Sequence, residues 1–126
     1  MLDNVNSKVE EFIIEQIESV PHLEALLLIW KNHPQKWFVQ DMARALYVPP
    51  EVAERVLSDL QARDLIVRSP DGSDSYFYHP SEERDGLLKD VDRTYRTQLV
   101  RVSSLIHSKA SAAVRDFAKA FRFKKD

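Results

Sequence analysis

The residues that could bind a metal or move protons are few and widely separated. His22, His33, His79 and His107 are scattered, and no second histidine stands three or four residues from any of them. No serine lies near both a histidine and an acid in a recognisable catalytic motif. The absence of cysteine excludes thiolate metal sites, disulfides and a cysteine nucleophile. We therefore expect no enzyme, no catalytic residue, no metal site and no cofactor.

Phosphate binding by a glycine-rich loop is also excluded, because Gly72 and Gly86 are the only glycines. The remaining candidates are the charged residues, which could act by electrostatic binding. Residues 1–80 hold 13 Asp and Glu against 7 Lys and Arg, whereas residues 81–126 hold 7 against 11. An acidic front half (residues 1–80) and a basic back half (residues 81–126) suggest an anionic partner or a self-complementary assembly.

The basic charge is densest near the C-terminus, where Arg115, Lys119 and Arg122 are expected opposite an apolar helix face that includes Phe117 and Phe121. Its cations are Arg115, Lys119, Arg122, Lys124 and Lys125. The favoured interpretation is packing within the chain or in a dimer, with the cations in solvent or facing the acidic front half. Contact with a nucleic-acid backbone is second, and an anionic membrane surface is the least favoured, since no tryptophan anchors the segment.

Length and composition set the scale of the molecule. A chain of 126 residues can form one domain with a modest core, or a small domain with added helices. No apolar run approaches the roughly 18 residues of a membrane span, and the first residues do not resemble a signal peptide. The lack of cysteine fits a reducing compartment. We expect a cytoplasmic protein.

Apolar residues recur at helical spacing along most of the first 60 positions. Residues 1–20 predict an N-terminal helix, which Pro21 should end or interrupt, and a second helix should stop before His33-Pro34. Residues 36–38 suit a short strand, and residues 39–46 form a two-turn helix. Pro49-Pro50 then predict a tight bend before a third helix, since proline suits the first helical position.

Two apolar runs follow, Leu65–Val67 and Tyr76–Tyr78, and residues 69–75 between them are typical of a turn. They predict a β-hairpin. From Leu88 to Phe121 apolar residues recur about every 3.7 residues without a proline, which predicts one long helix, bent if anywhere near Ser103-Ser104 or Ser108–Ser111. The expected organisation is an N-terminal helix (1–20), a central domain (21–80) and a long C-terminal helix (81–126) that serves dimerisation.

The stretch ALYVPPEVAERVLSDLQARDLIV, residues 45–67, resembles the core of ArsR-, MarR- and PadR-type bacterial transcription regulators without a gap. Leu46, Val48, Ala53, Leu57, Leu60, Leu65 and Ile66 fall at the apolar positions of that family pattern, and Arg55 falls on its common arginine. The resemblance implies a winged helix-turn-helix domain, mainly α with a small β-hairpin.

In regulators of this type the third helix enters the DNA major groove and the hairpin, or wing, lies along the backbone. The resemblance therefore implies an outward face made of Pro50, Glu51, Val52, Glu54, Arg55 and Ser58. The implied wing residues are Arg68, Ser69, Asp71, Ser73 and Ser75. The polar Ser and Thr of the family are replaced here by Glu51, Val52 and Glu54.

Two functions follow from this surface. The leading hypothesis is a homodimeric regulator that binds double-stranded DNA with modest affinity. The alternative is an interaction module that does not bind DNA and whose acidic third helix docks on a protein partner, because carboxylates near phosphates weaken DNA binding.

Overall fold

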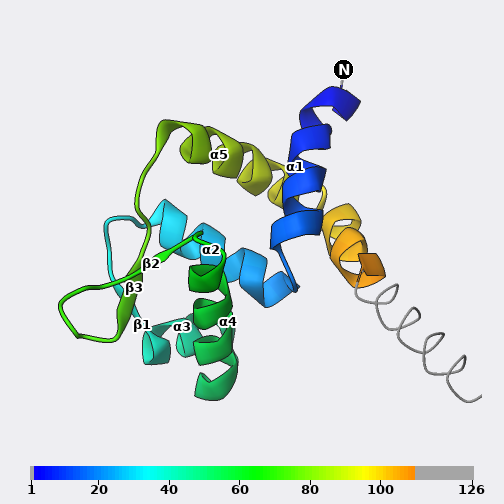
Figure 1. Cartoon of the computed structure of the whole chain (residues 1–126). Helices are drawn as coiled ribbons and strands as arrows, with labels where there is room; N and C mark the ends of the chain where they lie inside the picture. The colour runs from blue at the N-terminus through cyan, green and yellow to red at the C-terminus, as the bar shows by residue number, and fades with distance from the viewer. Residues whose placement is uncertain (1, 110–126) are drawn as a thin grey trace, which may run out of the picture.

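The computed structural model describes residues 2–109, with side chains from residue 7 onward (Figure 1). Helices make up most of this part of the chain, and three short strands form one small sheet. The mainly α fold with a β-hairpin is therefore confirmed. Residues 110–126, which contain the five cations of the basic C-terminal segment, lie outside the described residues.

Three helices form the helix-turn-helix unit: α2 (Val20–Lys31), α3 (Val39–Leu46) and α4 (Pro50–Ala62). The bend predicted at Pro49-Pro50 is confirmed, because Pro49 is the N-cap of α4 and Pro50 lies in its first turn. Pro49 provides no side-chain cap. Tyr47 ends α3 in the left-handed region, with φ of 58°, a conformation that favours glycine or asparagine.

The wing is a hairpin of β2 (Val67–Arg68) and β3 (Ser75–Phe77), and the sheet is completed by β1 (Trp37–Phe38). The strand order is β1-β3-β2 and both pairs are antiparallel. Val67 pairs with Phe77 and Trp37 with Tyr76. The predicted hairpin is confirmed, although the paired strand begins at Val67, since Leu65 and Ile66 are buried before it.

The helix α1 (Leu2–Gln16) packs against α5 (Glu82–Thr97) on the side of the molecule away from the wing (Figure 1). The apolar stripe expected on the first helix is confirmed, as Val9, Phe12, Ile13 and Ile17 are buried. The expected role of Pro21 is wrong. Helix α1 already ends at Gln16, and Pro21 lies in the first turn of α2, which Ser19 caps.

The C-terminal helix is interrupted earlier than predicted. Helix α5 ends at Thr97, Gln98 has φ of −134° and ψ of 50°, and residues 99–109 form a further helix. No break occurs at Ser103-Ser104. The Thr97 hydroxyl donates to the Arg93 carbonyl at 2.8 Å, a contact that competes with the helical backbone and favours a bend. The new direction lets Val102 and Ile106 join the buried core.

Within residues 2–109, no helix is long and apolar enough to cross a membrane.

Candidate functional site

The outward face expected on the third helix is found on α4. Pro50, Glu51, Val52, Glu54, Arg55 and Ser58 are all exposed. The opposite face carries Ala53, Val56, Leu57 and Leu60, which are buried against α2 and α3. The period of the helix explains this separation, because apolar residues three and four apart form one stripe. Helix α4 therefore presents a polar surface to the outside.

A cleft of about 520 Å³ separates this face from the wing. Glu51, Glu54 and Asp59 reach it from α4, and Asp74 reaches it from the wing. Arg55 and Arg68 are the cations on its walls. Four carboxylates against two guanidinium groups leave the cleft acidic.

Not all of the predicted wing residues are exposed. Ser69 and Ser75 are buried, so their prediction as surface contacts is wrong. Their backbones form the end of the hairpin, where Ser69 N–H donates to the Ser75 carbonyl at 2.7 Å. Ser69 directly follows β2 and Ser75 begins β3, so both side chains lie where the hairpin closes and are covered there. Ser73 is half-buried, and its hydroxyl forms a hydrogen bond of 2.7 Å with the Ser75 hydroxyl.

The exposed wing charges are paired with one another or with nearby residues. The Arg68 guanidinium contacts the Asp74 carboxylate, and Lys36 Nζ lies 2.8 Å from Asp71 Oδ2. The Lys36 ammonium, together with Ser73, holds the pKa of Asp71 well below its ordinary value. Asp71 therefore stays charged and stabilises the turn by accepting from the Ser73 N–H at 2.9 Å.

Two cations of residues 81–126 contact helix α1, whereas the expectation for the five C-terminal cations lies outside the described residues. Arg101 Nη2 lies 2.5 Å from Glu10 Oε2 on α1. Lys109 donates to the Ile14 carbonyl at 2.8 Å and also contacts the carbonyls of Ile13 and Ile17 at the end of α1. Burial lowers the pKa of Lys109. These contacts fasten residues 99–109 to the first helix.

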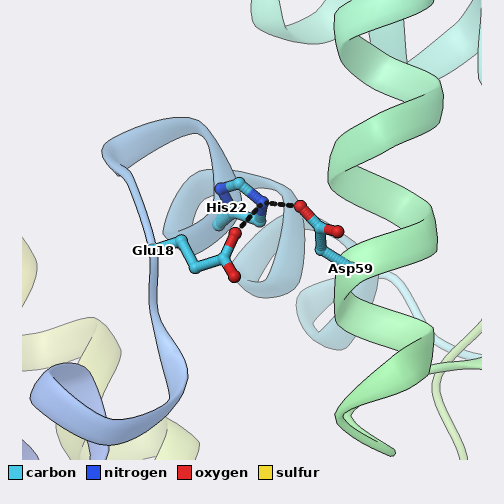
Figure 2. Close-up of side chains that lie close together, drawn as sticks. All are labelled: Glu18, His22 and Asp59. Carbon is cyan, nitrogen blue, oxygen red and sulfur yellow. Dashed lines mark hydrogen bonds and ion pairs between the residues drawn. The ribbon is translucent and has the colours of Figure 1, made fainter.

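A second cluster of functional groups was not foreseen from the sequence, which predicted no metal site. His22 Nε2 lies 2.9 Å from Asp59 Oδ2 and 3.5 Å from Glu18 Oε2. Figure 2 shows both carboxylates directed at this one ring nitrogen, from the α1–α2 connection and from α4. Glu18 stands four residues before His22, but Asp59 is distant in sequence, so only the fold brings the three together.

No protein-family model matches this chain, and no curated protein matches it in sequence. Solved structures do resemble it. The YusO protein of Bacillus subtilis is 17% identical, with a TM-score of 0.53, over 96% of this chain and 86% of that one. MepR, a transcription regulator of the Staphylococcus aureus multidrug efflux pump MepA, is 14% identical, with a TM-score of 0.51, over 95% and 92%.

The adhesin competence repressor AdcR of Streptococcus pyogenes is 18% identical, with a TM-score of 0.50, over 99% of this chain and 95% of that one. At these identities the likeness shows the fold alone. It extends over nearly the whole chain and is not confined to the helix-turn-helix unit. The winged helix fold expected from residues 45–67 is confirmed, and two of these three structures are described as a transcription regulator and a repressor.

Proposed function

We propose that this protein is a DNA-binding transcription regulator that places α4 in the major groove and the wing against the backbone. The observation that supports this most directly is the position of α4. Its entire outward face is exposed beside the wing, in a fold shared with regulator structures. The chemistry of that face determines how strongly and how specifically DNA is bound.

Arg55 is the principal contact in this proposal, because it is exposed at the centre of the α4 face. A guanidinium can bind guanine with two hydrogen bonds or bind a phosphate. Glu51 and Glu54 can accept a hydrogen bond from the cytosine amino group, but they repel phosphates. Binding should therefore be modest in affinity, strongly dependent on salt, and selective through a few base contacts.

We further propose that the protein binds as a homodimer formed by the terminal helices. Leu99 and Val100 are 52% and 78% exposed at the start of the last described helix, and Ile14 on α1 is 45% exposed. A second protomer would cover these apolar side chains, since homodimer interfaces are rich in apolar area. A twofold pair would present two copies of α4, and half-sites are bound when such helices lie about 34 Å apart.

The proposal is tested by the anisotropy of fluorescent random and genomic duplexes at increasing salt. We expect binding at about 50 mM salt that weakens steeply as salt is raised, since each phosphate contact releases counterions. Arg55→Gln should lose affinity, whereas Arg93→Gln, on α5 and away from the cleft, should not. No binding of any duplex at about 50 mM salt would end the proposal.

One observation favours a second candidate, a winged-helix module that docks on a protein. The cleft beside α4 is lined by four carboxylates, which would suit a basic peptide surface. The double variant Glu51→Gln/Glu54→Gln separates the two functions. It should raise affinity for DNA if α4 contacts DNA, and it should weaken capture of a basic partner if α4 docks on protein.

A further inference from the structure

We propose that Glu18, His22 and Asp59 bind one divalent transition-metal ion of the Zn²⁺ class, and that this ion fastens α4 to the connection between α1 and α2 (Figure 2). The three residues come from the α1–α2 connection, the start of α2 and the middle of α4. Nothing in the proposed DNA contacts requires this convergence.

The spacing of the three ligand atoms suits a small ion. They all lie within 4.8 Å of one another. A tetrahedral ion with bonds of about 2.0–2.2 Å holds its ligands about 3.3–3.6 Å apart. His22 Nε2 and Glu18 Oε2 are already separated by 3.5 Å. His22 Nε2 and Asp59 Oδ2 are 2.9 Å apart and need to separate by roughly half an ångström.

The imidazole of His22 is held in a fixed orientation by Ser19. The Ser19 hydroxyl lies 2.6 Å from His22 Nδ1, and Ser19 also caps α2 through the His22 N–H. When the proton is on Nδ1, it is donated to Ser19 Oγ, and the lone pair of Nε2 faces two carboxylates. A cation is then required between them. An oriented outer hydrogen bond of this kind is the usual support of a metal-bound histidine.

In the tautomer with its proton on Nε2, His22 donates to Asp59 and the Ser19 hydroxyl donates to Nδ1. Metal binding requires the other tautomer, in which the proton is on Nδ1 and Ser19 Oγ accepts it. Arg63 donates to Glu18 Oε1 at 3.0 Å, so Glu18 offers a single oxygen, Oε2, to the ion.

The ligand set and its exposure indicate the kind of ion. One imidazole and two carboxylates suit Zn²⁺, Co²⁺ or Mn²⁺, whereas Mg²⁺ and Ca²⁺ prefer oxygen ligands alone. The His22 side chain is only 10% exposed, while those of Asp59 and Glu18 are 31% and 46% exposed. The ion is therefore reached from solvent past the carboxylates, and a water molecule completes its coordination.

Binding at this place would change the DNA-facing surface, a consequence that rests on the proposed function. Asp59 also lines the cleft between α4 and the wing. A bound dication neutralises the two carboxylates and restricts α4 relative to α2. We therefore expect Zn²⁺ to raise affinity for DNA. Metal binding itself is measured without DNA, so failure of one proposal is distinguishable from failure of the other.

The test is a Co²⁺ titration of the untagged full chain at near-neutral pH, followed by visible absorption. We expect a tetrahedral Co²⁺ spectrum that saturates at one equivalent, is displaced by Zn²⁺ and is unaffected by excess Mg²⁺. Zn²⁺ should also raise the unfolding temperature by mass action. Glu18→Gln and Asp59→Asn should each weaken Co²⁺ affinity at least about tenfold.

His79→Gln is the matched control, because His79 is an exposed histidine outside the cluster, and it should titrate as the wild type does. Ser19→Ala should weaken binding about tenfold, and Ser19→Thr, which keeps the hydroxyl, should restore it. Circular dichroism of each metal-free variant shows whether it is folded. The proposal is overturned if the wild type gives no Co²⁺ spectrum, or if the spectrum survives in folded Glu18→Gln and Asp59→Asn.

Discussion

Arg68 and Asp74 are paired across the wing, where the guanidinium at the end of β2 contacts the carboxylate just before β3. Both side chains line the cleft beside α4. The cation that the winged-helix resemblance assigns to the DNA backbone is therefore neutralised within the wing. Exposed pairs of this kind contribute little to stability, so the pairing matters more for binding than for folding.

Asp74→Asn should release Arg68 and strengthen DNA binding. Asparagine tolerates the positive φ of 59° at this position, so the turn is retained. One additional phosphate contact should increase the loss of affinity between about 50 and 200 mM salt roughly threefold. The measurement is anisotropy on one duplex at both salt concentrations. Asp90→Asn, which breaks the Asp90–Arg93 pair on α5, is the matched control and should leave the salt dependence unchanged.

Tyr47→Gly should stabilise the protein by about 0.5–1 kcal/mol. Tyr47 has a φ of 58° and its side chain is 94% exposed, so glycine relieves the left-handed backbone without removing packing. The strain relieved is about 1–2 kcal/mol. It exceeds the stability that is lost because glycine increases the conformational entropy of the unfolded chain. Urea unfolding measures the difference. Tyr47→Ala keeps a Cβ atom and should bring no gain, and equal gains from both variants would contradict the argument.

The helix-turn-helix unit and wing could be predicted because their signals are local. Proline at a helix start, apolar residues at helical spacing and a turn between two apolar runs each depend on a few neighbouring residues. The break at Gln98 could not be predicted from local signals. It depends on the burial of Val102 and Ile106 in the core and on the hydrogen bond of the Thr97 hydroxyl, and neither contact is visible in the sequence.

The site was only partly predictable for a related reason. The outward face of α4 follows from the helical period, and all six expected residues are exposed. The burial of Ser69 and Ser75 depends on how the closed end of the hairpin packs, which a turn-rich segment does not reveal. The cluster around His22 could not be predicted, because it depends on the contact between His22 and Asp59. These residues are 37 positions apart, and their spacing along the chain does not indicate a contact.

Lys109→Met should destabilise the protein by about 1 kcal/mol. Lys109 Nζ donates to the carbonyl oxygens of Ile13, Ile14 and Ile17 at the C-terminal end of α1, and these hydrogen bonds offset the cost of burying its charge, which lowers the pKa of Lys109. Methionine keeps the apolar stem but leaves these carbonyls to water. Chemical unfolding measures the change, and Lys89→Met, at an exposed position on α5, should be neutral. A neutral Lys109→Met would show that the contact contributes nothing.

Tyr95→Phe should remove part of the loss of stability at alkaline pH. The Tyr95 hydroxyl donates to Glu24 Oε2 at 3.0 Å, and burial, followed by this carboxylate, raises the pKa of Tyr95 to about 12 from 10.0. Because the folded value lies above the unfolded one, this contribution is fully present below pH 10.0 and is lost as the pH rises towards about 12.

The free energy of unfolding, measured in urea from neutral pH to about pH 12, should therefore fall less steeply for Tyr95→Phe than for the wild type. Glu24→Gln is the informative companion, because it keeps the buried hydroxyl but removes the negative charge that opposes ionisation. Its decline should begin at the same pH, which the unfolded chain sets, but should end at a lower pH and be smaller in total, because the folded pKa of Tyr95 then lies closer to 10.0. Parallel curves for wild type and Tyr95→Phe would mean that the hydroxyl ionises equally in the folded and unfolded chains.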